Sequence, residues 1–186
     1  MKDSKERFRA SATYDAATIN AAYKTVLYTY GKPLILIRVA IGAVLMLTVL
    51  FVHMSLVLSL PLMVIGCFLF VSYDFPARMR AQSYIRKHTG KPETKACRFL
   101  DDKIATKEEE KSYKDISRLV YDDNYLYIFF SRKDYIVIAI PTIVPHDTGE
   151  LKTMVASKSG KAWDTVSLAL LSHQERSEKR KEHKSL

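Results

Sequence analysis

Side chains that carry catalysis in other proteins are scattered along this 186-residue chain and form no recognised pattern. Catalysis needs an acid, a base or a nucleophile held within mutual reach. The sequence contains no Gly-rich phosphate loop, no Ser-His-Asp order and no His-Glu-x-x-His pair to bring such groups together. The histidines are far apart in the sequence, at His53, His88, His146, His173 and His183. We therefore expect a protein that is not an enzyme and uses no cofactor, with an undetected hydrolase as the catalytic alternative.

Acidic and thiol side chains could hold a metal only if their spacing suited coordination. The pairs Asp101-Asp102 and Asp122-Asp123 fall in predicted turns, where an Asp side chain commonly bonds the backbone. The three glutamates at 108–110 are typical of a solvated hairpin end. Cys67 and Cys97 lie outside any CxxC or Cys/His cluster. We expect no metal centre.

The elements around these residues begin with an almost continuous apolar block at residues 34–73. Its halves, 34–52 and 56–73, would be helices of about 28 and 27 Å, close to the roughly 30 Å of a bilayer core. Both halves are apolar all round, whereas a buried helix of a soluble protein keeps a polar face. A cleaved signal peptide is disfavoured because a mostly polar segment precedes the block and a second span follows it. We predict a transmembrane helical hairpin.

Four residues inside the block could affect the predicted spans. Arg38 lies about one turn inside the first span, where its side chain can snorkel to the headgroups; an ion-path role is disfavoured because neither span holds an acidic partner. Pro61 either marks the first turn of the second helix or kinks that helix. Gly42 and Gly66 allow close helix contact without specifying an oligomeric state.

Basic residues near the block predict its orientation. Lys24 and Lys32 precede the first span, several basic residues follow the second, and none stands between the spans. By the positive-inside rule both termini are cytoplasmic, as in a multi-pass protein of a bacterial inner (plasma) membrane.

The net charge of +9 is concentrated just after the block. A basic juxtamembrane segment attracts anionic lipid of the inner leaflet, although the same charges could serve only as a topology signal. Nucleic acid is a disfavoured partner because no nucleic-acid-binding motif accompanies the charge. The candidate lipid-headgroup residues are Lys32, Arg38, Arg78, Arg80, Arg86 and Lys87.

Polar regions flank the predicted hairpin. Residues 1–33 contain a helix capped by Asp15, with a possible strand at 11–13, and residues 74–94 form a basic helix and linker. From 95 to 158, short runs of β-formers separated by charged turns predict an antiparallel meander, including one strand over 112–121. Asp147 then caps a closing helix near 147–157. A flat sheet with two helices on one face is the competing architecture.

The final segment, 159–186, has apolar residues near helical spacing, namely Trp163, Val166, Leu170 and Leu171, and then a charged tail. It is either a helix packed on the preceding domain or an amphipathic segment on the membrane, with Trp163 as interfacial anchor.

This architecture resembles the YcxB-like family of bacterial membrane proteins. The resemblance lies in Ala12-Thr-Tyr-Asp15, Phe99-Leu-Asp-Asp-Lys-Ile104, Tyr113-Lys-Asp-Ile116, Tyr125-Leu-Tyr127 and Ala139-Ile-Pro141. Tyr113 stands where the family often has Trp. The resemblance covers the chain to about residue 158. It implies a membrane α-helical hairpin with an α+β cytoplasmic domain, a pleckstrin-homology-like antiparallel barrel closed by a C-terminal helix, and it implies no activity.

Together these features favour a non-catalytic, membrane-tethered binding or scaffold protein with a protein partner that the sequence does not identify. The runner-up is an accessory or regulatory subunit of a transporter or envelope complex, held through its hairpin.

Overall fold

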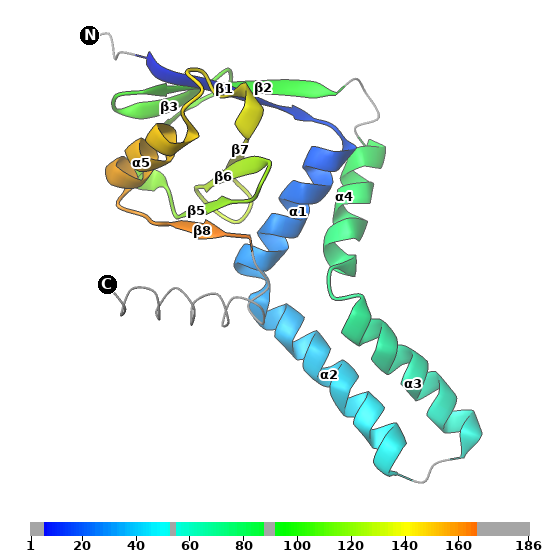
Figure 1. The fold of residues 1–186 in the computed structure, drawn as a ribbon. Helices are drawn as coiled ribbons and strands as arrows, with labels where there is room; N and C mark the ends of the chain where they lie inside the picture. The colour runs from blue at the N-terminus through cyan, green and yellow to red at the C-terminus, as the bar shows by residue number, and fades with distance from the viewer. Residues whose placement is uncertain (1–5, 53–54, 88–91, 167–186) are drawn as a thin grey trace, which may run out of the picture. The chain divides into compact units, whose positions relative to one another are not determined.

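The computed structural model describes residues 6–52, 55–87 and 92–166 (Figure 1). They form an α+β fold whose contacts separate into two compact units. The first unit comprises residues 1–22 and 88–186, and the second comprises residues 23–87. The α+β class predicted from the sequence is confirmed.

Four antiparallel strands make the first sheet of the α+β unit. They lie in sequence order, β1 (Glu6–Tyr14), β2 (Glu93–Leu100), β3 (Lys103–Thr106) and β4 (Glu110–Ser112). The β1–β2 ladder runs from a pairing of Glu6 with Leu100 to one of Tyr14 with Glu93. Strand β1 therefore exists, and it is longer than the possible strand predicted at 11–13.

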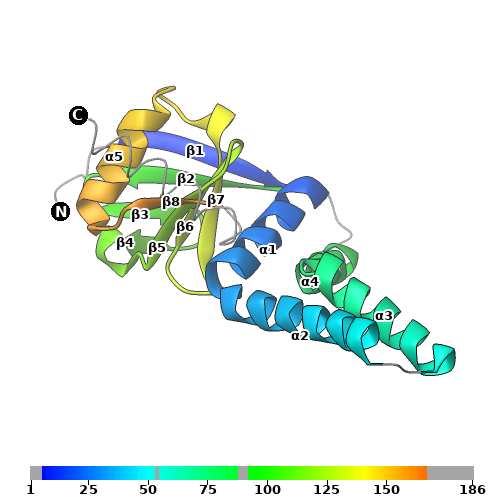
Figure 2. The ribbon, with the colours of Figure 1, turned by 60° about the horizontal axis from the view of Figure 1, so that its bottom comes forward.

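The second sheet has the order β7-β6-β5-β8 (Figures 1 and 2). Strands β5 (Arg118–Tyr121), β6 (Tyr125–Phe129) and β7 (Tyr135–Ala139) are antiparallel neighbours. Strand β8 (Trp163–Thr165) adds to β5 in parallel. The helix predicted at Trp163 is therefore wrong, because this residue pairs with Leu119 in a strand. Residues 167–186, including Leu170 and Leu171, lie outside the described residues.

A turn separates the two sheets where the sequence predicted one strand over 112–121. Strand β4 ends at Ser112, a 3-10 turn follows at Tyr113–Asp115, and β5 begins at Arg118. The Ser112 side chain accepts a hydrogen bond from the Lys114 amide, which favours the turn over extended backbone. The prediction of one unbroken strand is wrong, because the chain changes sheets here.

Strand β1 of the first sheet also contacts the segment that follows β7 of the second sheet. Arg9 and Val144 exchange two backbone hydrogen bonds of 2.8 Å. The Ser11 amide donates to Thr142 Oγ1 at 3.0 Å, and the same hydroxyl lies 2.6 Å from the Ser11 carbonyl oxygen. Backbone and side-chain hydrogen bonds therefore hold β1 against this segment.

Inward-facing side chains of both sheets form one core that includes Phe8, Phe99, Ile104, Leu126 and Ile138, all at most 3% exposed. Helix α5 (Thr148–Ser159) adds Leu151 and Val155 to this core and crosses near the ends of β1, β2 and β3 (Figure 2). Asp147 caps α5 as predicted, since its Oδ1 accepts from the Glu150 amide at 2.7 Å.

Strand β6 is buried on both of its faces. Leu126 and Ile128 face the core, while Tyr127 and Phe129 are also fully buried and are not among the core cluster. The hydroxyls of Tyr125 and Thr18 lie 3.0 Å apart, so the first turns of helix α1 (Ala16–Tyr30) lie against this second face. Asp15 caps α1 as predicted, accepting from the Thr18 amide at 2.8 Å.

The helical unit contains the end of α1 together with α2 (Lys32–Phe51), α3 (Leu56–Val71) and α4 (Phe75–Lys87). Helices α2 and α3 pack closely through their glycines. A Cβ atom built on Gly42 would lie 2.8 Å from the Gly66 carbonyl oxygen. Pro61 lies inside α3, beyond its first turn, which excludes the interpretation that it begins the helix.

Candidate membrane-contacting surface

Exposed apolar side chains of the described residues are concentrated in the helical unit. The large hydrophobic residues that are well exposed all lie between Leu34 and Tyr84, apart from Val144. Val57 and Phe51, for example, are 82% and 79% exposed. Soluble monomers rarely expose a contiguous apolar patch above a few hundred Å², because each Å² in water costs about 25 cal/mol. This surface therefore requires a non-aqueous environment or an apolar partner.

Helix α2 is long and apolar enough to cross a bilayer. Its 20 residues span about 30 Å and are predominantly apolar. Helix α3 has 16 residues, about 24 Å, and reaches the same length only together with α4, from which it is bent by 71°. Among the residues that the structure describes, α2 is thus the one helix that is long and apolar enough by itself to cross a bilayer. A second crossing of that length requires α3 and α4 together.

Two tyrosine pairs join the end of α1 to the α3–α4 junction and to α4. The ring centroids of Tyr23 and Tyr84 lie 6.1 Å apart, and those of Tyr28 and Tyr73 lie 6.5 Å apart. Burial raises the pKa of Tyr23, and burial together with a hydrogen bond to Tyr73 raises the pKa of Tyr28. These phenols therefore remain neutral hydrogen-bonding groups over the physiological pH range. Tyr side chains with an apolar body and a polar tip are enriched at membrane–water interfaces.

Three basic side chains accompany these tyrosines. Lys24 Nζ lies 5.7 Å from the centre of the Tyr28 ring. The charge of Arg80 lowers the pKa of Tyr23 in opposition to burial, and Arg78 acts similarly on Tyr28. Arg78 is paired with Asp74 at 2.8 Å, so its charge is compensated.

The other predicted headgroup residues do not join this group. Lys32 is exposed at the first residue of α2, and Arg38 is half-buried two turns into the same helix. Arg86 and Lys87 are exposed in the last turn of α4. The structure thus brings together only Arg78 and Arg80 of the six predicted residues.

Sequence reasoning missed the tyrosines, and it used Lys24 only as an orientation signal. Tyr23 lies in the helix that was predicted within residues 1–33, and its ring contacts that of Tyr84, sixty-one positions later. The available signal was the enrichment of Tyr and Lys at both ends of the apolar block, which is typical of membrane interfaces.

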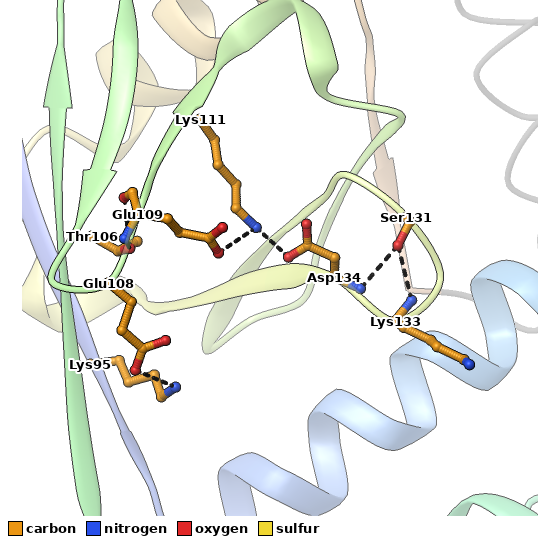
Figure 3. A network of polar contacts seen from close by, with 8 residues as sticks. All are labelled: Lys95, Thr106, Glu108, Glu109, Lys111, Ser131, Lys133 and Asp134. Carbon is orange, nitrogen blue, oxygen red and sulfur yellow. Dashed lines mark hydrogen bonds and ion pairs between the residues drawn. The ribbon is translucent and has the colours of Figure 1, made fainter.

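Figure 3 shows three carboxylates of the α+β unit, those of Glu108, Glu109 and Asp134, beside lysine side chains. In the glutamate run, Glu108 pairs with Lys95 at 3.4 Å, Glu109 with Lys111 at 2.8 Å and Glu110 with Lys103 at 2.6 Å. Each glutamate of this run is therefore paired with a lysine; Glu110 joins β4 to β3, while Glu108 and Glu109 lie in the turn between these strands. Within residues 6–52, 55–87 and 92–166, no three His, Cys, Asp or Glu side chains are placed to hold a metal ion.

Lys111 is the most buried of these lysines, with 9% of its side chain exposed. Its ammonium contacts Asp134 as well as Glu109, and it lies 4.6 Å from the centre of the Phe130 ring. Burial acts to lower the pKa of Lys111, but the hydrogen bonds to Asp134 and Glu109 outweigh burial, and the net pKa is raised. Lys111 therefore links β4, at the edge of one sheet, to the β6–β7 turn of the other.

The aspartate pairs act on the backbone and on neighbouring side chains. Asp122 Oδ1 accepts from the amides of Asn124 and Tyr125, and its Oδ2 accepts from the Tyr127 hydroxyl at 2.8 Å. Asp101 accepts from Arg7 at 2.9 Å. His146 is exposed, and the other four histidines lie outside the described residues.

Trp163 is fixed within the α+β unit. Its indole N–H donates to the Lys152 carbonyl oxygen at 2.8 Å, and its ring packs edge-on against Tyr121. Burial lowers the pKa of Lys152, whose ammonium lies 3.2 Å from the centre of the Tyr121 ring. Trp163 therefore packs on β5 and α5. Its role as an interfacial anchor stays a prediction.

Comparison of this chain with profiles of known protein families, with curated proteins and with solved structures found no match. The candidate surface is therefore interpreted from its own geometry.

Proposed function

We propose that this chain is a non-catalytic, membrane-tethered binding or scaffold protein. In this proposal α2 and α3 form a two-span hairpin in a bacterial inner membrane. The α+β unit lies in the cytoplasm, and its binding partner is a protein segment or the membrane itself.

The observation that carries the proposal is the ladder between β1 and β2. The chain leaves β1 at Tyr14, passes through every apolar helix, and returns in β2 at Glu93, which pairs with Tyr14. Two paired strands must lie on the same side of a membrane. Any crossing by α2 therefore requires a crossing back before β2, and α3 is the apolar helix available for it.

The distribution of charge supports the cytoplasmic location of the α+β unit. Basic residues precede α2 and follow α3, and the loop between these helices has none. The exposed cations on α4 are then close to the anionic inner leaflet, which we propose as the lipid partner.

The strand order supports a pleckstrin-homology-like arrangement and, with it, the YcxB-like family. Four antiparallel strands are followed by a second antiparallel sheet and then by a helix that contributes to the core. Strand β8, which pairs with β5 in parallel, is not part of the expected antiparallel arrangement.

Cysteine labelling in intact cells tests the topology. A membrane-impermeant maleimide should label Ser55→Cys, between the spans, and should fail to label Lys114→Cys, an exposed residue of the α+β unit. Both variants should be labelled after permeabilisation, which serves as the control. Labelling of Lys114→Cys in intact cells, or release of the protein from membranes by alkaline carbonate, would contradict the proposal.

An accessory subunit of a transporter or envelope complex is the second candidate. The observation that favours it is the apolar exposure around the helical pair, which suits partner helices as well as lipid. Crosslinking followed by affinity capture separates the two candidates. Crosslinks that map to α2 or α3 support the accessory subunit, and crosslinks that map to the α+β unit support the binding module.

A further inference from the structure

We propose that the two tyrosine pairs and their cations form a binding site for the headgroup of an anionic phospholipid. The site, called here the tyrosine–cation surface, comprises Tyr23, Lys24, Tyr28, Tyr73, Arg80 and Tyr84. This inference rests on the proposed membrane insertion and adds a defined lipid site to it.

The arrangement of the helices explains why these residues meet. Tyr23 precedes Tyr28 on α1, while their partners occur in the reverse order, with Tyr84 opposite Tyr23 and Tyr73 opposite Tyr28. The end of α1 and the segment 73–84 therefore run in opposite directions, with two aromatic contacts between them. Lys24 and Tyr28 are four residues apart on one helical face, which places the ammonium over the ring.

The charges of this surface are only partly compensated. Asp74 neutralises Arg78 through contacts of 2.8 and 2.9 Å. Lys24 and Arg80 form no ion pair with any described residue, and Arg80 is exposed. Two exposed cations, one on α1 and one on α4, are therefore uncompensated among the described residues, and in this proposal both contact one anion. A guanidinium binds a phosphate through two parallel hydrogen bonds, and an ammonium adds a point charge.

The position along the chain matches the depth of a lipid phosphate. Tyr73 follows α3 by two residues and Tyr28 precedes α2 by four, so both lie within about 6 Å of chain rise from the apolar helices. The headgroup region occupies roughly 5–7 Å on each side of the hydrocarbon core. Along the chain, Lys24 lies about one helical turn before Tyr28 and Arg80 about two turns after Tyr73, both further from the apolar helices. Their long side chains can reach back toward the phosphate.

The occupant should carry net negative charge. A zwitterionic headgroup places its own ammonium beside the phosphate and would meet Lys24 and Arg80 with like charge. Phosphatidylglycerol has a net negative phosphodiester, and its glycerol hydroxyls can hydrogen-bond with the tyrosine hydroxyls. We therefore assign the site to an anionic glycerophospholipid.

Spin-labelled lipids test the assignment in the full-length protein reconstituted in phosphatidylcholine vesicles. The measured quantity is the association constant of spin-labelled phosphatidylglycerol relative to spin-labelled phosphatidylcholine. Wild type should prefer phosphatidylglycerol, and Lys24→Gln or Arg80→Gln should each reduce the preference about fivefold, the effect of one basic residue near an anionic surface. The double variant should remove most of the preference.

Matched controls separate a defined site from diffuse attraction. Asp74→Asn combined with Arg78→Gln removes a compensated pair and should leave the preference unchanged. Lys32→Gln and Lys87→Gln remove exposed cations near the membrane but outside the site, and each should have a smaller effect than Lys24→Gln.

Two results would overturn the inference. One is an unchanged preference in the Lys24→Gln, Arg80→Gln double variant; the other is a loss in Lys32→Gln as large as that in Lys24→Gln. In both cases the proposed function would survive as long as the protein stays in the vesicles. Failure of wild type to co-float with any vesicle would instead refute the proposed function together with this site.

Discussion

The two units of this chain treat apolar and charged side chains in opposite ways. In the α+β unit, residues such as Leu126 and Phe99 are fully buried, and Lys95, Lys103 and Lys111 each contact a carboxylate. In the helical unit, the apolar side chains are exposed on α2 and α3, and the buried positions of these helices are Ile35, Gly42 and Gly66. One unit buries its apolar side chains, and the other exposes them.

The difference shows that burial has a separate meaning in each unit. Burial in the α+β unit removes side chains from water and supplies its stability. Burial between α2 and α3 allows two backbones to approach, because glycine has no side chain at the contact. The same substitution should therefore have unequal effects in the two units.

The largest expected difference comes from one substitution made in each unit. Leu126→Ala should destabilise the α+β unit by about 2–5 kcal/mol, because it leaves a cavity in a closely packed core. Leu50→Ala, at a side chain that is 71% exposed, should leave stability nearly unchanged in detergent micelles or bilayers, because the apolar medium fills the space. Urea unfolding followed by circular dichroism measures both variants. Equal losses would contradict the proposed contrast.

The glycine contact should be the sensitive position in the helical unit. Gly42→Ala places a Cβ atom 2.8 Å from the Gly66 carbonyl oxygen, so the helices must separate. We expect a loss of about 1–3 kcal/mol, typical of overpacking. Ala40→Val adds volume at an exposed position of the same helix and is the matched control. Unfolding in mixed micelles of increasing denaturing-detergent fraction gives both values, and a larger loss for Ala40→Val would reject the contact.

The ion pairs of Lys111 involve a buried ammonium, whereas the neighbouring lysines form more exposed pairs. Lys111→Met should cost about 1–3 kcal/mol at pH 7, because Glu109 and Asp134 lose a partially desolvated partner. Lys103→Met should cost much less, because the Lys103–Glu110 pair is exposed and screened by salt. Thermal unfolding of the two variants in parallel gives the comparison.

The raised pKa of Lys111 also predicts a pH dependence. A raised folded-state pKa contributes stability that is fully present below the ordinary lysine pKa and is lost as pH rises through the folded value. Wild type should therefore lose this contribution only in strongly alkaline solution, above about pH 10. Lys111→Met should therefore lose less stability than wild type as the pH rises above this value. Identical profiles of stability against alkaline pH for the two proteins would contradict this prediction.

The smallest effect is expected at the start of α1. Asp15→Ala should cost about 1 kcal/mol by removing the cap on the Thr18 amide. That hydrogen bond lowers the pKa of Asp15, so its contribution is present above the ordinary carboxyl pKa and is lost as pH falls through the folded value. Asp15→Asn, which can still accept a hydrogen bond, should retain stability at neutral pH and lose the acid dependence. If stability falls with decreasing pH in Asp15→Asn as it does in wild type, the titration of Asp15 does not cause that loss.

Local patterns in the sequence predicted much of the fold. The apolar block, the caps at Asp15 and Asp147, and the β-forming runs of β6 and β7 depend on neighbouring residues, so they could be recognised without coordinates. The turn at Tyr113–Asp115 contains no Gly or Pro and interrupts a run that reads as a strand. It follows from the need to pass from one sheet to the other.

Contacts between distant residues account for what the sequence did not predict. Strand β8 depends on β5, and the position of Trp163 depends on Lys152 of α5. The tyrosine pairs depend on the packing of α1 against the segment that follows α3. The sequence pattern of a single helix could not identify which distant residues would contact Tyr23 and Tyr28.

The pairing of β1 with β2 has a consequence for the timing of synthesis. Tyr14 emerges from the ribosome 79 residues before Glu93, its partner in the ladder. At translation rates of about 5–20 residues per second, β1 is synthesised roughly 4–16 s before its partner strand β2. Throughout that interval it is an unpaired strand edge, of the kind that pairs with other chains. A ribosome-bound chaperone that covers β1 until β2 has been made would therefore protect the nascent protein throughout this interval.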